Sequence, residues 1–203
     1  TINRPEKLNA CNLEQHAELP MILRDLARDD DVVVAVVTGA GRAFCIGGDL
    51  DWMAVQSTNP EMLCSQLNDA REVIWAHIDL EKPIIAAVNG FAMGAGSVFA
   101  LYCDFVIVER QALIADGHVR AALLAGDGGA LIWPLTIGLT KAKQYLLTGD
   151  WMTAEDAERF GLVTEVVEEG QSLRRATQIA ERLAAGPQTA IRWTKRSLNQ
   201  WLR

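Results

Sequence analysis

Val32 to Gly41 reads VVVAVVTGAG, a run of mostly β-branched residues that ends in two glycines. A strand with one wet face would alternate apolar and polar residues. A continuous apolar run is instead typical of a parallel strand that is buried on both faces. Two further short apolar runs, 84–88 and 105–108, predict strands of the same kind. We therefore expect parallel strands in the interior of the fold.

Helical patterns lie between and after these strands. Apolar residues fall on one face of 13–27 (Leu19, Ile22, Leu23 and Leu26), and 61–78 follows Asn59-Pro60, a helix-start signal. Further helices are expected over 93–102, from the capping residue Thr153 to Gly161, along 173–183 before Gly186-Pro187, and over 188–201. Strands that alternate with helices indicate an α/β fold.

Composition bounds the domain organisation. The chain has 203 residues, of which 50% are apolar, enough for one core without disulfides or metals. No internal repeat or linker is visible, so 1–203 is interpreted as a single domain, with a helical C-terminal portion from about residue 140. The first residue is a threonine, and we expect the chain to be incomplete at both termini.

Charge and cysteine content exclude several classes of protein. The net charge of −7 argues against a nucleic-acid-binding protein, and no nucleic-acid partner is expected. Residues 171–203 hold seven Lys/Arg and one acid, which predicts either a solvated helix face or a cationic flank near an anionic ligand or subunit.

Four scattered cysteines favour a reduced, cytoplasmic protein. The three histidines lie far apart, so no metal site is predicted. The apolar stretch 83–108 is interrupted by polar residues and is not expected to span a membrane.

Two glycine-rich segments each follow a predicted strand: GAGRAFCIGGDL at 39–50 and NGFAMGAGS at 89–97. Neither contains a Gly-Lys-Ser/Thr sequence or a complete GxGxxG, so phosphate-loop and dinucleotide sites are not supported. Glycine lets a ligand approach the main chain closely. Two N–H groups that converge on one point make an oxyanion hole. The alternative is that these glycines only form tight turns and helix contacts.

Four segments resemble the crotonase superfamily, the enoyl-CoA hydratase/isomerase family, in order and spacing. They are 3–10 (NRPEKLNA), 38–50, 86–96 (AAVNGFAMGAG) and 146–167 (LLTGDWMTAEDAERFGLVTEVV). The resemblance implies an α/β, crotonase-like ββα spiral with C-terminal helices. It also implies an acyl-CoA substrate, no cofactor apart from the coenzyme A that the substrate carries, and a homotrimer or a dimer of trimers.

By position, the family's oxyanion hole falls on the N–H groups of Ile46 and Ala95. The same resemblance implies substrate and CoA binding by Ile46, Gly47, Gly48, Asp49, Gly94 and Ala95. Ile46 departs from the small residue that the family usually carries, and it would narrow the acyl pocket. Asp49 can also be interpreted as a structural turn or cap residue.

The catalytic positions depart further from the family. Hydratases of this family use two glutamates, whose positions here hold Val98 and His118. Val98 cannot ionise, so the two-glutamate machinery is absent. His118 is a candidate single acid/base with a pH limb near about 6–7, or else a structural histidine. Asp127 is the second candidate, one residue after the aspartate of some family isomerases; alternatively it caps a turn between glycines.

A single acid/base favours double-bond isomerisation, because one group can remove and return the same proton. Decarboxylation and thioester hydrolysis also occur in the family. The alternatives are hydration with a non-standard base and a catalytically weak CoA-binding homologue.

Overall fold

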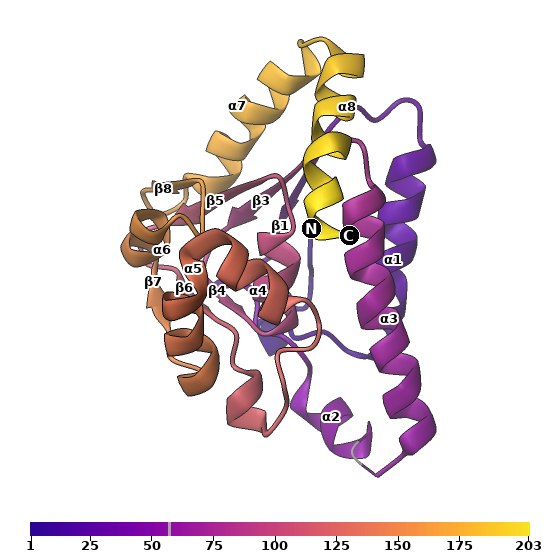
Figure 1. Cartoon of the computed structure of the whole chain (residues 1–203), viewed down its shortest axis with the longest axis vertical. Coiled ribbons are helices and arrows are strands. Elements are labelled where there is room, and N and C mark those ends of the chain that lie inside the picture. The colour runs from indigo at the N-terminus through magenta and orange to yellow at the C-terminus, as the bar shows by residue number, and fades with distance from the viewer. Residues whose placement is uncertain (57) are drawn as a thin grey trace.

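The computed structural model describes residues 1–56 and 58–203, and over this range the strands form two four-stranded sheets (Figure 1). The first sheet has the order β1 (Ala35–Thr38), β3 (Ile84–Val88), β5 (Phe105–Glu109), β8 (Glu165–Val167). The second has the order β2 (Ala43–Cys45), β4 (Phe91–Met93), β6 (Leu113–Ala115), β7 (Met152–Thr153). The strand pairs are parallel, apart from β6 with β7.

The chain visits both sheets in turn and then forms a helix. Strands β1 and β2 precede α2 (Leu50–Gln56) and α3 (Pro60–Asp79), and β3 and β4 precede α4 (Ala95–Leu101). Strands β5 and β6 precede the short helix η2 (His118–Ala121) and α5 (Gly129–Thr148). This succession of two strands and a helix is the expected ββα spiral, and the predicted α/β class is confirmed.

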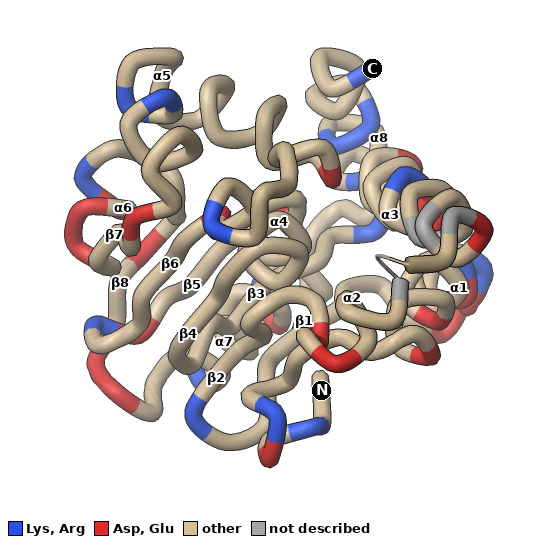
Figure 2. Tube along the Cα trace, turned by 90° about the horizontal axis from the view of Figure 1, so that it is seen from below, with Lys and Arg blue, Asp and Glu red and all other residues tan. Residues whose placement is uncertain are grey.

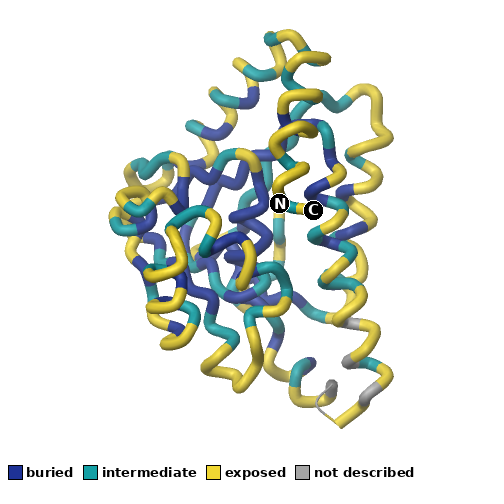
Figure 3. Tube along the Cα trace, in the orientation of Figure 1, coloured by how far each residue is buried: buried dark blue, intermediate teal, exposed yellow. Residues whose placement is uncertain are grey.

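The remaining helices cover the outside of the spiral. They are η1 (Pro5–Lys7), α1 (Leu13–Arg28), α6 (Ala154–Phe160), α7 (Ser172–Ala184), α8 (Gln188–Asn199) and η3 (Gln200–Leu202). Helix α1 packs along α3, and α7 packs on β1, β3 and β5. Strands β2, β3 and β5 are largely buried, whereas these helices expose their outer faces (Figure 3).

Strand β3 is buried on both faces, as a continuous apolar run predicts. Ile84, Ala86 and Val88 face the main core. Ile85 and Ala87 face a second cluster that contains Ala176 and Ala180 of α7. Each fully buried isoleucine or valine side chain stabilises the fold by about 1.5–3 kcal/mol.

Several predicted bounds were wrong. The first strand begins at Ala35 rather than Val32, and each glycine segment contains a three-residue strand, β2 or β4, that was taken as loop. Met93 ends β4, so the helix predicted from it begins at Ala95. Ile22 is 51% exposed rather than on the packed face of α1. Strands of three residues between glycines are too short to show a periodicity.

The basic C-terminal region forms ion pairs with carboxylates elsewhere in the chain. Arg175 pairs with Glu165, Lys195 with Asp104, Arg196 with Glu81, and Arg203 with Asp79. Basic and acidic residues are interspersed along the trace (Figure 2). This pairing favours a solvated helix face over a cationic flank. Within the described residues, the helices are too short or too polar to cross a bilayer.

Candidate active site

The two glycine segments lie against each other at the edge of the second sheet. A Cβ atom on Gly96 would lie 2.2 Å from the carbonyl oxygen of Cys45, so only glycine lets α4 begin against the end of β2. Gly47 has a φ of +86°, and its Cβ position lies 3.0 Å from the carbonyl oxygen of Met93 and 3.6 Å from the nitrogen of Ala95. The segments that carry Ile46 and Ala95 are therefore in direct contact.

Ile46 and Ala95 are each half-buried between buried neighbours, so both lie where the packed interior opens outward. Ala95 is the first residue of α4, and a helix offers its first N–H groups no acceptor of its own. The structure thus brings together the two segments that the sequence singled out, with the N–H of Ala95 left without an intrahelical acceptor.

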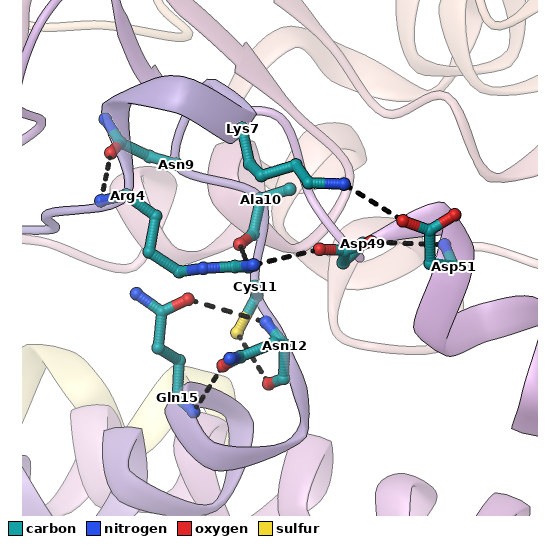
Figure 4. A network of polar contacts seen from close by, with 9 residues as sticks. All are labelled: Arg4, Lys7, Asn9, Ala10, Cys11, Asn12, Gln15, Asp49 and Asp51. Carbon is teal, nitrogen blue, oxygen red and sulfur yellow. Dashed lines mark hydrogen bonds and ion pairs between the residues drawn. The ribbon is translucent and has the colours of Figure 1, made fainter.

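Asp49 serves the backbone of this site. Its carboxylate lies 3.1 Å from the Arg4 guanidinium and accepts a 3.1 Å hydrogen bond from the N–H of Asp51 in the first turn of α2 (Figure 4). Cys11 donates to the carbonyl of Gly47 at 2.7 Å and accepts from the N–H of Asp49 at 2.9 Å. The Gly47–Asp49 segment is thus held by hydrogen bonds to the N-terminal segment that contains Arg4 and Cys11. The Asp49 side chain thus caps the first turn of α2, and its part in CoA binding stays a prediction.

His118 lies between two carboxylates. Asp116 follows directly after β6. Gly117 has a φ of +73° and turns the chain, so that His118 begins η2. The Nδ1 of His118 is 2.8 Å from Oδ1 of Asp116, and its Nε2 is 3.2 Å from Oδ2 of Asp127. Asp127 precedes Gly128, whose φ of +107° starts α5. The turns at Gly117 and Gly128 thus align two acids on opposite sides of one imidazole.

The two carboxylates determine the charge of His118. Burial lowers the pKa of His118, but the hydrogen bond with Asp116 and the nearby charges of Asp127 and Asp116 more than offset it and raise the pKa to about 10. His118 is therefore an imidazolium at neutral pH. The pH limb near 6–7 assumed an imidazole without acidic neighbours, and with two carboxylates beside His118 we expect the limb at higher pH.

Asp127 is half-buried, and its two buried carboxylate oxygens have unused acceptor capacity. Among the described residues, neither of its oxygens accepts an aligned hydrogen bond, although the His118 Nε2 is within ion-pair distance. Gly128 is the N-cap residue of α5, and Asp127 does not cap this turn, because no N–H group in the described part of the chain donates to either of its oxygens. Burial and the charge of Asp127 raise the pKa of Tyr102 to about 12. Asp127 can therefore accept a proton or a hydrogen bond from a ligand.

The cluster formed by Asp116, His118 and Asp127 lies beside the two glycine segments. A Cβ atom on Gly94 would lie 3.8 Å from Cε1 of His118 and 3.8 Å from Cα of Gly47. Val98, one turn further along α4, is 2% exposed and brings no ionisable group. Asp116 was not predicted as a site residue, although its position two residues before His118, across a glycine, is a signal for a carboxylate–imidazole pair.

Asp116, His118 and Asp127 also meet the simplest criterion for a metal site, since one ligand atom from each lies within 4.8 Å of the others. However, Asp116 contacts Nδ1 and Asp127 contacts Nε2, and these two nitrogens point to opposite sides of the ring. One ion therefore cannot replace both contacts. The arrangement fits an imidazolium held between two carboxylates better than a metal centre.

A ββα spiral with two apposed glycine segments and an adjacent acid/base cluster defines an enzyme class that works on acyl-CoA thioesters. The whole chain, residues 1–203, matches the model of the family described as "Enoyl-CoA hydratase/isomerase". This protein belongs to the enoyl-CoA hydratase/isomerase family, and it is an enzyme of that family.

Relatives within the family carry out different reactions. The chain is 35% identical over 201 residues to 1,2-epoxyphenylacetyl-CoA isomerase of Escherichia coli (strain K12), covering 98% of this chain and 77% of that protein. It is 38% identical over 200 residues to (E)-benzylidenesuccinyl-CoA hydratase of Thauera aromatica, covering 97% and 76%. The crystal structure of an enoyl-CoA hydratase/isomerase from Mycobacterium paratuberculosis aligns with a TM-score of 0.95 at 38% identity, covering 98% and 80%. Its fold is therefore the fold of this chain.

Proposed function

We propose that this enzyme is an isomerase that moves a double bond of an unsaturated acyl-CoA from C3–C4 to C2–C3. One observation carries the proposal: Asp127, paired with His118 beside Gly94, has buried oxygens without aligned hydrogen bonds, while Val98 replaces the first hydratase carboxylate. One acid/base unit suffices for isomerisation but not for ordinary hydration.

The thioester carbonyl oxygen accepts hydrogen bonds from the N–H groups of Ile46 and Ala95. Asp127 takes a proton from C2, and the C–H electron pair enters a dienolate whose negative charge lies on the thioester oxygen. Asp127 then returns the proton to C4, and the electrons form the C2–C3 double bond. The proton count of the enzyme is the same before and after. Each oxyanion donor contributes about 2.7–4 kcal/mol to such a step.

His118 remains protonated throughout this cycle. Its raised pKa, about 10, gives the role of base to Asp127 rather than to the imidazole. The imidazolium holds the Asp127 carboxylate in place, and Asp116 holds the imidazolium from the other side. The 1,2-epoxyphenylacetyl-CoA isomerase among the relatives supports an isomerase, whereas the related hydratases support the alternative of hydration.

Comparison of two substrates tests the proposal. Conversion of 3-hexenoyl-CoA to 2-hexenoyl-CoA is expected to proceed readily. Hydration of crotonyl-CoA is expected to be slower than in a two-glutamate hydratase by about 10²–10⁴-fold, because Val98 cannot activate water. Both reactions change the absorbance of the conjugated thioester. Efficient hydration would establish the alternative with a non-standard base. Tight acyl-CoA binding without either reaction would establish a CoA-binding homologue.

The proposal extends to the cofactor, the oligomeric state and the cellular compartment of the enzyme. Coenzyme A enters as part of the substrate and no separate cofactor is required. We expect a homotrimer or a dimer of trimers, which light scattering after gel filtration measures. The four cysteines are unpaired, and Cys11, Cys45 and Cys103 are buried, which supports a reduced compartment such as the cytoplasm.

A further inference from the structure

Tyr102 lies against the turn that carries the proposed base. It is the C-cap residue of α4 and is 8% exposed. A Cβ atom on Gly128 would lie 2.9 Å from Cε2 and 3.0 Å from the hydroxyl oxygen of Tyr102, so the turn rests directly on this ring. The hydroxyl also donates a 3.3 Å hydrogen bond to the carbonyl oxygen of Gly128. Tyr102 therefore contacts the residue that follows Asp127 through both its ring and its hydroxyl.

The hydroxyl bond ties α4 to the start of α5. The Gly128 carbonyl also accepts from two N–H groups in the first turn of α5, at 3.1 and 3.0 Å. At its other end, α4 begins at Ala95, about 10 Å from Tyr102 along the helix axis. Residues 96–101 between them are buried, so packing holds this helix in place. Helix α4 thus runs from the N–H assigned to the oxyanion hole to the ring that supports the base.

The Asp127 side chain has little else to hold it. Within the described residues, neither carboxylate oxygen accepts an aligned hydrogen bond, and His118 contributes an ion pair at 3.2 Å. Glycines at 126 and 128 flank Asp127, and glycine leaves the backbone free to adopt many conformations. The position of the base therefore depends on contacts that hold its turn, and Tyr102 supplies such contacts at Gly128.

The protonation state of Tyr102 suits a supporting role. Burial, and after it the charge of Asp127, raise the pKa of Tyr102 to about 12. The hydroxyl therefore stays protonated at neutral and moderately alkaline pH and continues to donate to Gly128. A group that titrates so far from neutral pH is a poor general acid or base. Tyr102 is thus suited to hold the turn rather than to exchange a proton with the substrate.

We propose that Tyr102 is a positioning residue for the isomerisation, which fixes the Asp127 carboxylate relative to the N–H of Ala95. The thioester oxygen binds at the start of α4, and the ring at the end of α4 supports the turn of the base. One packed helix therefore sets the distance between the oxyanion hole and the base. Displacement of a catalytic group slows the reaction without weakening substrate binding. This inference rests on the proposed function, in which Asp127 is the base.

Turnover and affinity of Tyr102→Phe test this role. The substitution removes the hydroxyl and keeps the ring, so kcat for 3-hexenoyl-CoA is expected to fall about three- to tenfold, the effect of one hydrogen bond. Affinity for hexanoyl-CoA, an unreactive saturated analogue, is expected to be unchanged in calorimetry, because the proposed role gives Tyr102 no contact with the ligand. Unchanged kcat, or weaker binding at unchanged kcat, overturns the inference.

Tyr145→Phe is the matched control. Tyr145 is 7% exposed and lies on the same helix as Gly128, but its ring lies beside Trp133, with 6.0 Å between the ring centres. Loss of this hydroxyl is expected to leave kcat unchanged. An equal fall of kcat in Tyr145→Phe and Tyr102→Phe overturns the inference, because it would show a general effect of losing a buried hydroxyl.

A double substitution separates positioning of the base from general support of the fold. In an Asp127→Asn background the base is absent, so Tyr102→Phe is expected to lower the residual turnover no further, measured at raised enzyme concentration. The same fold-loss in both backgrounds overturns the inference. Tyr102→Met, which also fills the space without a hydroxyl, is the second variant if Tyr102→Phe does not fold, and the same outcomes decide. Absence of isomerisation by the wild type would instead overturn the proposed function, and this inference with it.

Discussion

His118 and His77 occupy opposite electrostatic environments within one fold. His77, on α3, is 1% exposed, its Nδ1 lies 3.1 Å from the carbonyl of Val73, and its ring meets the edge of Phe99 at 4.5 Å. Burial lowers the pKa of His77 to about 4. His118 is also largely buried, yet two carboxylates raise its pKa to about 10.

The difference shows that burial alone does not set the charge of a histidine. Loss of water disfavours the imidazolium in both places. Only at His118 do carboxylates on both ring nitrogens reverse that effect. A buried histidine in an apolar neighbourhood is neutral and structural, whereas one held between two acids is a fixed cation that can hold a reactive carboxylate in place.

Removal of Asp127 is expected to have the largest effect. Asp127→Asn keeps the shape of the side chain but removes the proposed base, so turnover of 3-hexenoyl-CoA should fall by about 10²–10⁴-fold. Steady-state kinetics measure this, together with hexanoyl-CoA affinity, which should be nearly unchanged. Asp150→Asn is the matched control, because Asp150 forms an exposed ion pair with Arg120. Full activity of Asp127→Asn would show that Asp127 is not the base, and that His118 therefore does not act by holding a base in place.

The structural histidine should affect stability against acid. The pKa of His77 lies near 4 in the folded state and at 6.5 in a free histidine, so the unfolded chain binds the extra proton between these values. Stability is therefore complete above about pH 6.5 and is lost as the pH falls toward 4, by about 3 kcal/mol at most. His77→Phe should flatten this acid slope in thermal melts.

His118 provides the contrast for that experiment. Its pKa is raised by folding, so its stabilising contribution is complete below about pH 6.5 and is lost as the pH rises through about 10. His118→Gln should therefore flatten the alkaline slope and leave the acid slope as in the wild type. The same slope in both variants would mean that the two histidines do not differ as described.

Asp116 should have a smaller, diagnostic effect. Asp116→Asn removes one of the two charges that raise the pKa of His118, so the alkaline limb of the pH–rate profile should move down from about 10. The maximal rate should change less than in Asp127→Asn, because Asp116 contacts the imidazole and not the base. An unmoved limb would show that Asp127 alone controls the charge of His118.

Much of the fold could be predicted from local patterns. The run at 84–88 is β3 with the predicted bounds, and Thr153 caps α6, which ends at Gly161 as predicted. The second sheet could not be predicted, since its strands have two or three residues each. The repeated ββα succession likewise leaves no visible sequence repeat, because the repeated feature is a backbone path that many different side chains can follow.

The sequence by itself determined where close approach is allowed: a glycine at 96 is required by the carbonyl of Cys45, and a glycine can be read without any structure. It also determined that Val98 brings no charge. Only the tertiary structure decided that Asp116 and Asp127 lie on the two sides of His118. The physical reason is that the charge of His118 depends on its distances to both carboxylates, and no local pattern encodes those distances.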